Sequence, residues 1–240
     1  MFRQLEILSA QAHGDLRLRS IEDYRFAALR SQVPLVFDEI VEAAKHFPIV
    51  FPASRAKTKP VALLGLRRAR NHFVAEDGRW QAGYVPAFLR RYPFVFGRHG
   101  NAGARHLTVM LDRKAPHLDR SEGQPLFDRP AGSTTASGAP TAMSQTVQDA
   151  VAFLSRYQEA ADQVTDRMAP LIEADVFVDR NLEMYVGTRR TNRITGIRVV
   201  DRERVAALDD ATLGRWARSG LLEAVHAHWQ SLTNFRQLTG

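Results

Sequence analysis

The sequence contains no cysteine, which excludes disulfide bonds and metal centres held by thiolates. It also has no apolar run near the roughly 18 residues that a membrane-spanning helix needs. Gln4, Glu6 and Gln11 interrupt the N-terminal stretch where a secretory signal peptide would have its apolar core, so we expect no signal peptide there. These absences predict a cytoplasmic protein without a transmembrane segment.

Lysine is scarce as well, being confined to positions 45, 57, 59 and 114, so the net charge of +7 comes mainly from arginine. A field of this sign suits nucleic acid, anionic lipid or an acidic partner. The arginines are scattered, however, and pairs such as Arg67-Arg68 and Arg90-Arg91 stand apart, without a long run of like charges. This pattern disfavours a nucleic-acid role and is better explained by a compositional preference for arginine.

The rest of the composition is ordinary for a globular protein, with 45% hydrophobic and 25% charged residues. A chain of 240 residues is long enough to bury a sizeable core, and we expect a single domain over residues 1–240. Apolar and aromatic residues are dense in residues 60–96, which we interpret as the buried centre of the fold.

Strand and helix signals follow one another without a regular βαβ alternation. This order predicts an α+β fold with a mixed, largely antiparallel sheet, packed helices and a C-terminal helical segment. Apolar patterning predicts strands at 49–51, 61–66, 94–96, 107–111, 171–178, 182–186 and 193–200, and two short ones within 3–20. Helical spacing predicts helices at 36–46, between Pro86 and Pro93, from Ser144 to Met168, and in a C-terminal pair divided at Ser219-Gly220.

Two connecting segments have distinct signatures. Asp77-Gly78 is a strong hairpin signal because both turn positions favour positive φ, so we expect a hairpin between residues 71–74 and 79–84. Residues 115–143 are rich in proline, glycine, serine and threonine and contain few large apolar groups. Burial offsets the entropy of ordering such a segment poorly, so we interpret it as a long surface loop that is mobile near residues 132–140.

Short motifs of one bacterial protein family occur along nearly the whole chain, in the order typical of that family. They are Phe47-Pro-Ile-Val-Phe51, Leu63-Leu-Gly-Leu66 with Asn71 and Phe73, Gly78-Arg-Trp80, Tyr84-Val-Pro86, Leu89-Arg-Arg-Tyr-Pro-Phe94, Gly123-Gln-Pro-Leu-Phe127, Ser219-Gly-Leu-Leu222, Ala227-His228 and Ser231-Leu-Thr-Asn234. With these motifs the chain resembles the SapC family, and the block from Trp80 to Phe94 is the most specific part. The resemblance implies an association with surface-layer (S-layer) formation or export, and it implies no catalytic residue set. The chain departs from the family pattern after Phe127, where a Gly/Ser/Thr/Ala-rich insert occupies residues 128–143.

The candidate binding residues are Trp80, Tyr84, Arg90, Arg91 and Tyr92, since tryptophan, tyrosine and arginine are enriched at interaction hot spots. The paired arginines suit a carboxylate or a phosphate, which guanidinium groups bind bidentately. The plainer interpretation is that the aromatic side chains fill the core while the arginines sit on the solvated side of a short helix.

An enzymatic alternative is a non-haem iron(II)/2-oxo acid-dependent oxygenase. His117 and Asp119 have the H-x-D spacing, and His226 would complete a two-histidine, one-carboxylate triad, with Arg236 binding the oxo acid. Against it, His226 and Arg236 fall within a helical tail, where residues ten apart lie about 15 Å apart along the axis. Three-residue H-x-D matches also arise often by chance.

We therefore favour a non-enzymatic accessory protein that binds a protein partner or an acidic envelope component and needs no cofactor. It would act in the cytoplasm or peripherally at the inner face of the envelope. The oxygenase is the alternative, with iron held by His117, Asp119 and His226.

Overall fold

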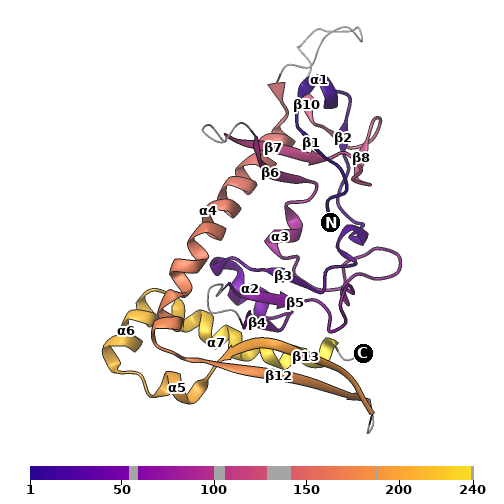
Figure 1. The fold of residues 1–240 in the computed structure, drawn as a ribbon. Helices are drawn as coiled ribbons and strands as arrows, with labels where there is room; N and C mark the ends of the chain where they lie inside the picture. The colour runs from indigo at the N-terminus through magenta and orange to yellow at the C-terminus, as the bar shows by residue number, and fades with distance from the viewer. Residues whose placement is uncertain (54–58, 100–105, 129–141, 187–188, 239–240) are drawn as a thin grey trace.

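The computed structural model describes residues 1–53, 59–99, 106–128, 142–186 and 189–238. It confirms a mixed α+β fold with antiparallel strand pairing and a helical C-terminal segment (Figure 1). The largest sheet has the strand order β12-β13-β4-β5-β3. Its strands are β3 (Gln32–Pro34), β4 (Ile49–Pro52), β5 (Val61–Leu63), β12 (Phe177–Val186) and β13 (Arg189–Val200).

Smaller sheets lie at the other end of the molecule (Figure 1). One has the order β1-β7-β6, with β1 (Leu5–Ile7), β6 (Phe94–His99) and β7 (His106–Asp112). A second has the order β8-β2-β9, with β2 (Arg17–Leu18), β8 (Leu118–Asp119) and β9 (Gln124–Pro125). The strands β10 (Phe127–Asp128) and β11 (Ala142–Met143) form a two-stranded pair.

The helices range from single turns to one long rod. The short ones are α1 (Ala10–His13), η1 (Arg25–Ala27), η2 (Phe37–Glu39), α2 (Ile40–Ala44), α3 (Ala87–Arg90) and α5 (Arg202–Ala206). The longer ones are α4 (Gln145–Glu173), α6 (Asp210–Arg218), α7 (Leu221–Ser231) and the 3-10 segment η3 (Leu232–Leu238). Asp209 caps α6 by accepting a hydrogen bond from Thr212 N, and Gly220 separates α6 from α7 in a left-handed conformation.

Helix α4 connects two hydrophobic clusters (Figure 1). Its 29 residues extend roughly 43 Å at 1.5 Å per residue. Val147 and Leu154 pack in the cluster beside the small β1-β7-β6 sheet, whereas Val164, Met168 and Leu171 pack in the large cluster beside the five-stranded sheet. The short helix α3 lies between these two regions, beside α4 (Figure 1).

Three sequence-based expectations were wrong in detail. The strand expected at 171–178 begins only at Phe177, because Leu171 continues the buried stripe of Val164 and Met168 and keeps the chain helical to Glu173. The turn at Gly78 has positive φ as expected, but the flanking segments form a single bridge, Val74 with Trp80, and no hairpin strands.

The third difference lies in the segment expected to be a loop from 115 to 143. Strands β8 and β9 pair with the two edges of β2, so residues 115–128 are tied to the N-terminal region by backbone hydrogen bonds. Residues 129–141, which include the part expected to be mobile, lie outside the described residues. No helix in the described part of the chain is both long enough and apolar enough to cross a membrane.

The turn before β9 supplies a stability test. Gly123 has φ +98°, and a Cβ there would lie 2.4 Å from the backbone oxygen of Leu18 in β2. Gly220 has φ +76° with nothing within 4 Å. Gly220→Ala should therefore lower the free energy of unfolding by about 1–2 kcal/mol, the cost of a left-handed conformation alone. Gly123→Ala should lower it further, because β2 must also shift. Equal destabilisation of the two variants in urea denaturation would contradict the close approach.

Candidate functional site

The short helix α3 carries the predicted Arg90-Arg91 pair, and a buried carboxylate fixes its N-terminus. Glu39 is only 6% exposed. Its Oε2 accepts hydrogen bonds from Ala87 N and from the Tyr84 hydroxyl, both at 2.8 Å, and its Oε1 accepts one from Val36 N at 2.9 Å. One side chain thus joins the start of η2, the segment before α3 and the first turn of α3.

A second buried carboxylate fixes the residue that follows the arginine pair. Asp112, which is 0% exposed, accepts a hydrogen bond from the Tyr92 hydroxyl at 3.1 Å. It also accepts hydrogen bonds from three backbone N–H groups, those of Arg3, Gln4 and Lys114. The Tyr92 ring stacks on Phe26 with centroids 4.0 Å apart. The segment 86–92 is therefore held at both ends by groups that water does not reach.

Both tyrosines stay protonated over the physiological range. Burial raises the pKa of Tyr84, and the neighbouring Glu39 carboxylate raises it further. Burial likewise raises the pKa of Tyr92, with Asp112 adding to the effect. Each hydroxyl is thereby kept as a donor to its carboxylate.

The two arginines of α3 contact aromatic rings of α4. The Arg90 guanidinium carbon lies 5.2 Å from the Phe153 ring centroid and 5.6 Å from that of Tyr84. Arg91 lies 4.2 Å from Phe88, 5.4 Å from Tyr157 and 5.7 Å from Phe2. Such cation–π contacts within about 6 Å are attractive, and they set both guanidinium groups in an aromatic surface.

The structure brings the five predicted binding residues together but gives them different roles. Tyr92 is 2% exposed and belongs to the core. Trp80 is half-buried against the core, and its Nε1 donates to the Tyr84 backbone oxygen at 2.8 Å. Tyr84 is bonded to Glu39. Arg90 is exposed and Arg91 is partly buried, so the arginines are the members of the set that present charge to the surface.

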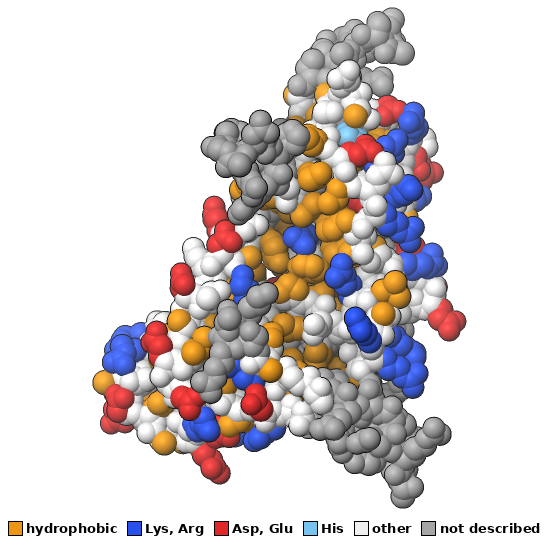
Figure 2. Space-filling view, in the orientation of Figure 1, with side chains coloured by type: hydrophobic (Ala, Val, Ile, Leu, Met, Phe, Trp, Pro, Cys, Tyr) orange, Lys and Arg blue, Asp and Glu red, His pale blue; other side chains and the backbone are white. Residues whose placement is uncertain are grey.

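Figure 2 shows the face of the molecule that contains this site. Hydrophobic side chains gather over the region of β6, β7 and α3, with arginine or lysine side chains among and beside them. Acidic side chains lie mainly at the margins of the view. We call the surface formed by Phe2, Phe88, Arg90, Arg91, Phe153 and Tyr157 the arginine–aromatic face.

Sequence reasoning missed the residues that complete this face from a distance. Phe153 and Tyr157 lie four residues apart on α4, a spacing that puts both rings on one side of the helix. That spacing was a usable signal, but nothing in the sequence specified which segment the rings would contact. Glu39 and Asp112 gave no signal, since neither belongs to a motif that marks a buried carboxylate.

The residues of the iron alternative are not brought together. His117 precedes β8 and His226 lies on α7, and these elements are at opposite ends of the molecule (Figure 1). His117 is buried, and its Nε2 is 2.8 Å from the Asp23 backbone oxygen. The Asp119 carboxylate accepts hydrogen bonds from Ser121 and Glu122, and His226 bonds to Leu222 O. Within the described residues, no group of three His, Asp or Glu side chains could hold a metal ion.

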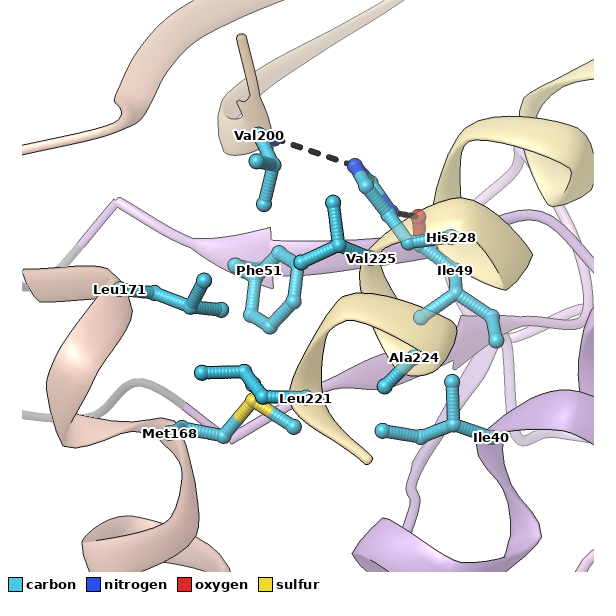
Figure 3. A pocket seen from close by; sticks show the side chains of 10 residues that line it. All are labelled: Ile40, Ile49, Phe51, Met168, Leu171, Val200, Leu221, Ala224, Val225 and His228. Atoms are coloured by element: carbon cyan, nitrogen blue, oxygen red, sulfur yellow. Dashed lines mark hydrogen bonds between the residues drawn. The ribbon is translucent and has the colours of Figure 1, made fainter. Parts of the chain in front are cut away.

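A cavity lies under the five-stranded sheet, between α4 and α7 (Figure 3). Its volume is about 10 Å³, near the minimum for one water molecule. Its lining is apolar except for His228, whose Nε2 accepts from Val200 N at 3.1 Å and whose Nδ1 donates to Ile49 O at 2.9 Å. Both ring nitrogens are thus used in joining α7 to β13 and β4, so this cavity is a packing feature and not a ligand site.

The fold and this face define a mixed α+β protein whose most distinctive surface is built from arginine and aromatic rings. The SapC family model matches residues 8–238, and the chain belongs to the SapC family. No curated protein and no solved structure matches the chain.

Removing the Glu39 carboxylate tests its role at α3. Glu39→Ala leaves three buried donors, Val36 N, the Tyr84 hydroxyl and Ala87 N, without their acceptor. Each unsatisfied buried group costs about 1–3 kcal/mol, so we expect a loss of about 3 kcal/mol or more in urea unfolding. Glu39→Gln keeps one carbonyl acceptor and should lose less. A loss below about 1 kcal/mol for Glu39→Ala would contradict the assigned role.

The buried His228 side chain should make the free energy of unfolding depend on pH. Burial lowers the pKa of His228 to about 4, from an ordinary value near 6.5. Folding favours the neutral ring, so this contribution is fully present above about pH 6.5 and is lost as the pH falls towards 4. We expect on the order of 3 kcal/mol to be lost across that window.

The measurement is chemical unfolding at a series of pH values between 4 and 7. His228→Gln should be less stable than wild type at neutral pH but should show a flatter pH dependence. His117, whose pKa is also lowered by burial, acts in the same direction and remains in both proteins. Parallel pH profiles for the two proteins would show that His228 is not a source of the acid sensitivity.

Proposed function

We propose that this protein is a non-catalytic, single-domain binding protein that assists surface-layer formation or export. It engages an acidic protein partner or another acidic envelope component through the arginine–aromatic face. It acts in the cytoplasm or peripherally at the inner face of the envelope. Membership of the SapC family supports the biological setting, and the structure supplies the surface.

The observation that supports the binding role concerns the ion pairing of Arg90, the last residue of α3, and of Arg91, its C-cap. Within the described residues, neither Arg90 nor Arg91 forms an ion pair, although both side chains are ordered by aromatic rings. A purely structural arginine normally gains a carboxylate partner when it is partly buried, because an unpaired buried charge is unfavourable. Figure 2 shows hydrophobic side chains gathered over the region of α3, the helix that ends at Arg90.

A charge-reversal experiment in the native host tests the proposal. Replacing Arg90 and Arg91 together with Glu should lower the amount of surface-layer protein in the envelope fraction to near the level of a strain lacking the gene. The exposed pair Arg67-Arg68, reversed in the same way, is the matched control and should leave that amount unchanged. Immunoblotting of both variants verifies that each accumulates as wild type does.

Two outcomes would overturn the proposal. One is an unchanged surface layer in the strain lacking the gene. The other is an equal effect of the two reversed pairs, which would indicate a dependence on net charge. If replacing Arg91 with Glu lowers the amount of the protein in the cell, the variant with Gln at positions 90 and 91 replaces it in the test. That variant removes the charges without introducing repulsion.

A further inference from the structure

The two arginines of the arginine–aromatic face differ in their free donors. The Arg90 Nε donates to Val85 O at 3.0 Å and its Nη2 donates to the Tyr84 hydroxyl at 3.2 Å. Arg91 donates only through Nε, to Phe88 O at 3.2 Å. Its two Nη groups therefore have no hydrogen-bond or ion-pair partner in the described part of the chain. These two groups form the end of the guanidinium that binds a planar carboxylate with two parallel hydrogen bonds.

The surroundings of Arg91 add a neutral donor. The Tyr157 hydroxyl has no hydrogen-bond partner among the residues described, and its ring is 5.4 Å from the Arg91 guanidinium carbon. Burial lowers the pKa of Arg91, the neighbouring Tyr157 opposes this lowering, and the charge of Arg30 adds to it. An anion bound here would be stabilised by the Arg91 guanidinium and the Tyr157 hydroxyl.

The nearby carboxylates cannot play the part of that anion. Asp112 is fully buried and already accepts four hydrogen bonds, and Glu39 already accepts three. Neither is within ion-pair distance of Arg91. The positive charge at this position therefore has no compensating acid within ion-pair distance in the described chain.

An apolar surface adjoins the site. Strand pairing places Leu5 opposite Asp112 and Ile7 opposite Met110, so these side chains share one face of the β1-β7-β6 sheet. Leu5 is 41% exposed and Ile7 is 38% exposed. Phe2, whose ring centroid lies 5.7 Å from the Arg91 guanidinium carbon, comes just before β1 in the sequence, so the chain leads from the Arg91 site to this apolar face.

We propose that Arg91, with Tyr157, binds one carboxylate side chain of an acidic protein segment whose neighbouring apolar residue packs on the Leu5–Ile7 face. A carboxylate fits better than a phosphate. It carries one charge into an aromatic surrounding, and a single fork of Nη donors satisfies it. The first turn of α3 offers an anion no backbone donor at Ala87, because Glu39 occupies it. The identity of the partner in this assignment rests on the proposed function. The chemistry of the contact rests on the geometry alone.

Selection from a random linear peptide library against the purified protein tests the assignment. We expect enriched peptides to contain Asp or Glu next to a large apolar residue. Binding of one enriched peptide, measured by calorimetry, should weaken on the order of tenfold with Arg91→Gln, about 1.4 kcal/mol. The same peptide with its acidic residue changed to the amide should lose a similar amount, and the two losses should not add, because both remove one contact.

Control variants separate binding from folding. Arg67→Gln, an exposed arginine outside the arginine–aromatic face, should change the affinity less than about twofold. Arg90→Gln should weaken binding less than Arg91→Gln, since its Nε and one of its Nη groups already donate within the chain. Tyr157→Phe keeps the ring that packs on Arg91 and removes only the hydroxyl, so it should weaken binding about threefold with unchanged thermal unfolding. The Tyr157→Phe variant keeps the test valid if Arg91→Gln lowers the yield of folded protein.

Several results would overturn the assignment. They are enrichment without acidic residues, equal affinity of wild type and Arg91→Gln, or a larger effect of Arg90→Gln than of Arg91→Gln. Binding to phosphatidylglycerol vesicles that depends on Arg91, with no peptide selected, would assign the site to a membrane surface instead. Peptide binding without any surface-layer phenotype would retain the site and reject the proposed function. A surface-layer phenotype without peptide binding would retain the proposed function and reject the site.

Discussion

The structure depends on two buried carboxylates that hold a single-turn helix. Glu39 and Asp112 together accept seven hydrogen bonds, and they fix the segment from Tyr84 to Tyr92 at both ends. A helix as short as α3 has no intrinsic stability in water, because a nucleus of one turn is unfavourable. Its position therefore comes from these tertiary contacts, and the placement of Arg90 and Arg91 follows from it.

Local sequence signals predicted the parts of the fold that local physics decides. The start of α3 after Pro86 and the break at Gly220 each follow from backbone chemistry within a few residues. The α+β class followed from the irregular order of strand and helix patterns. The strand expected from Leu171 failed because an apolar run of that length suits a buried helix as well as a strand, and contact with the large cluster decided between them.

The candidate site was predicted only in part for the same reason. Tryptophan, tyrosine and paired arginine drew attention to residues 80–92, and the structure does assemble them in one place. The sequence could not separate Tyr92, which packs on Phe26, from Arg91, which contacts Phe88 at the surface. That distinction depends on Phe2 and Tyr157, whose rings come from distant parts of the chain. Nothing in the sequence near Arg91 indicates that these rings contact it.

Phe153 and Tyr157 sit close to the middle of the 29-residue helix α4. Helices fray from their ends inward, and both ends of α4 are anchored in separate hydrophobic clusters. Phe153 and Tyr157 therefore lie away from both ends of α4, where unwinding of the terminal turns displaces side chains least. Anything that docks there meets a preorganised surface, so little of its binding energy is spent on ordering this side of the contact.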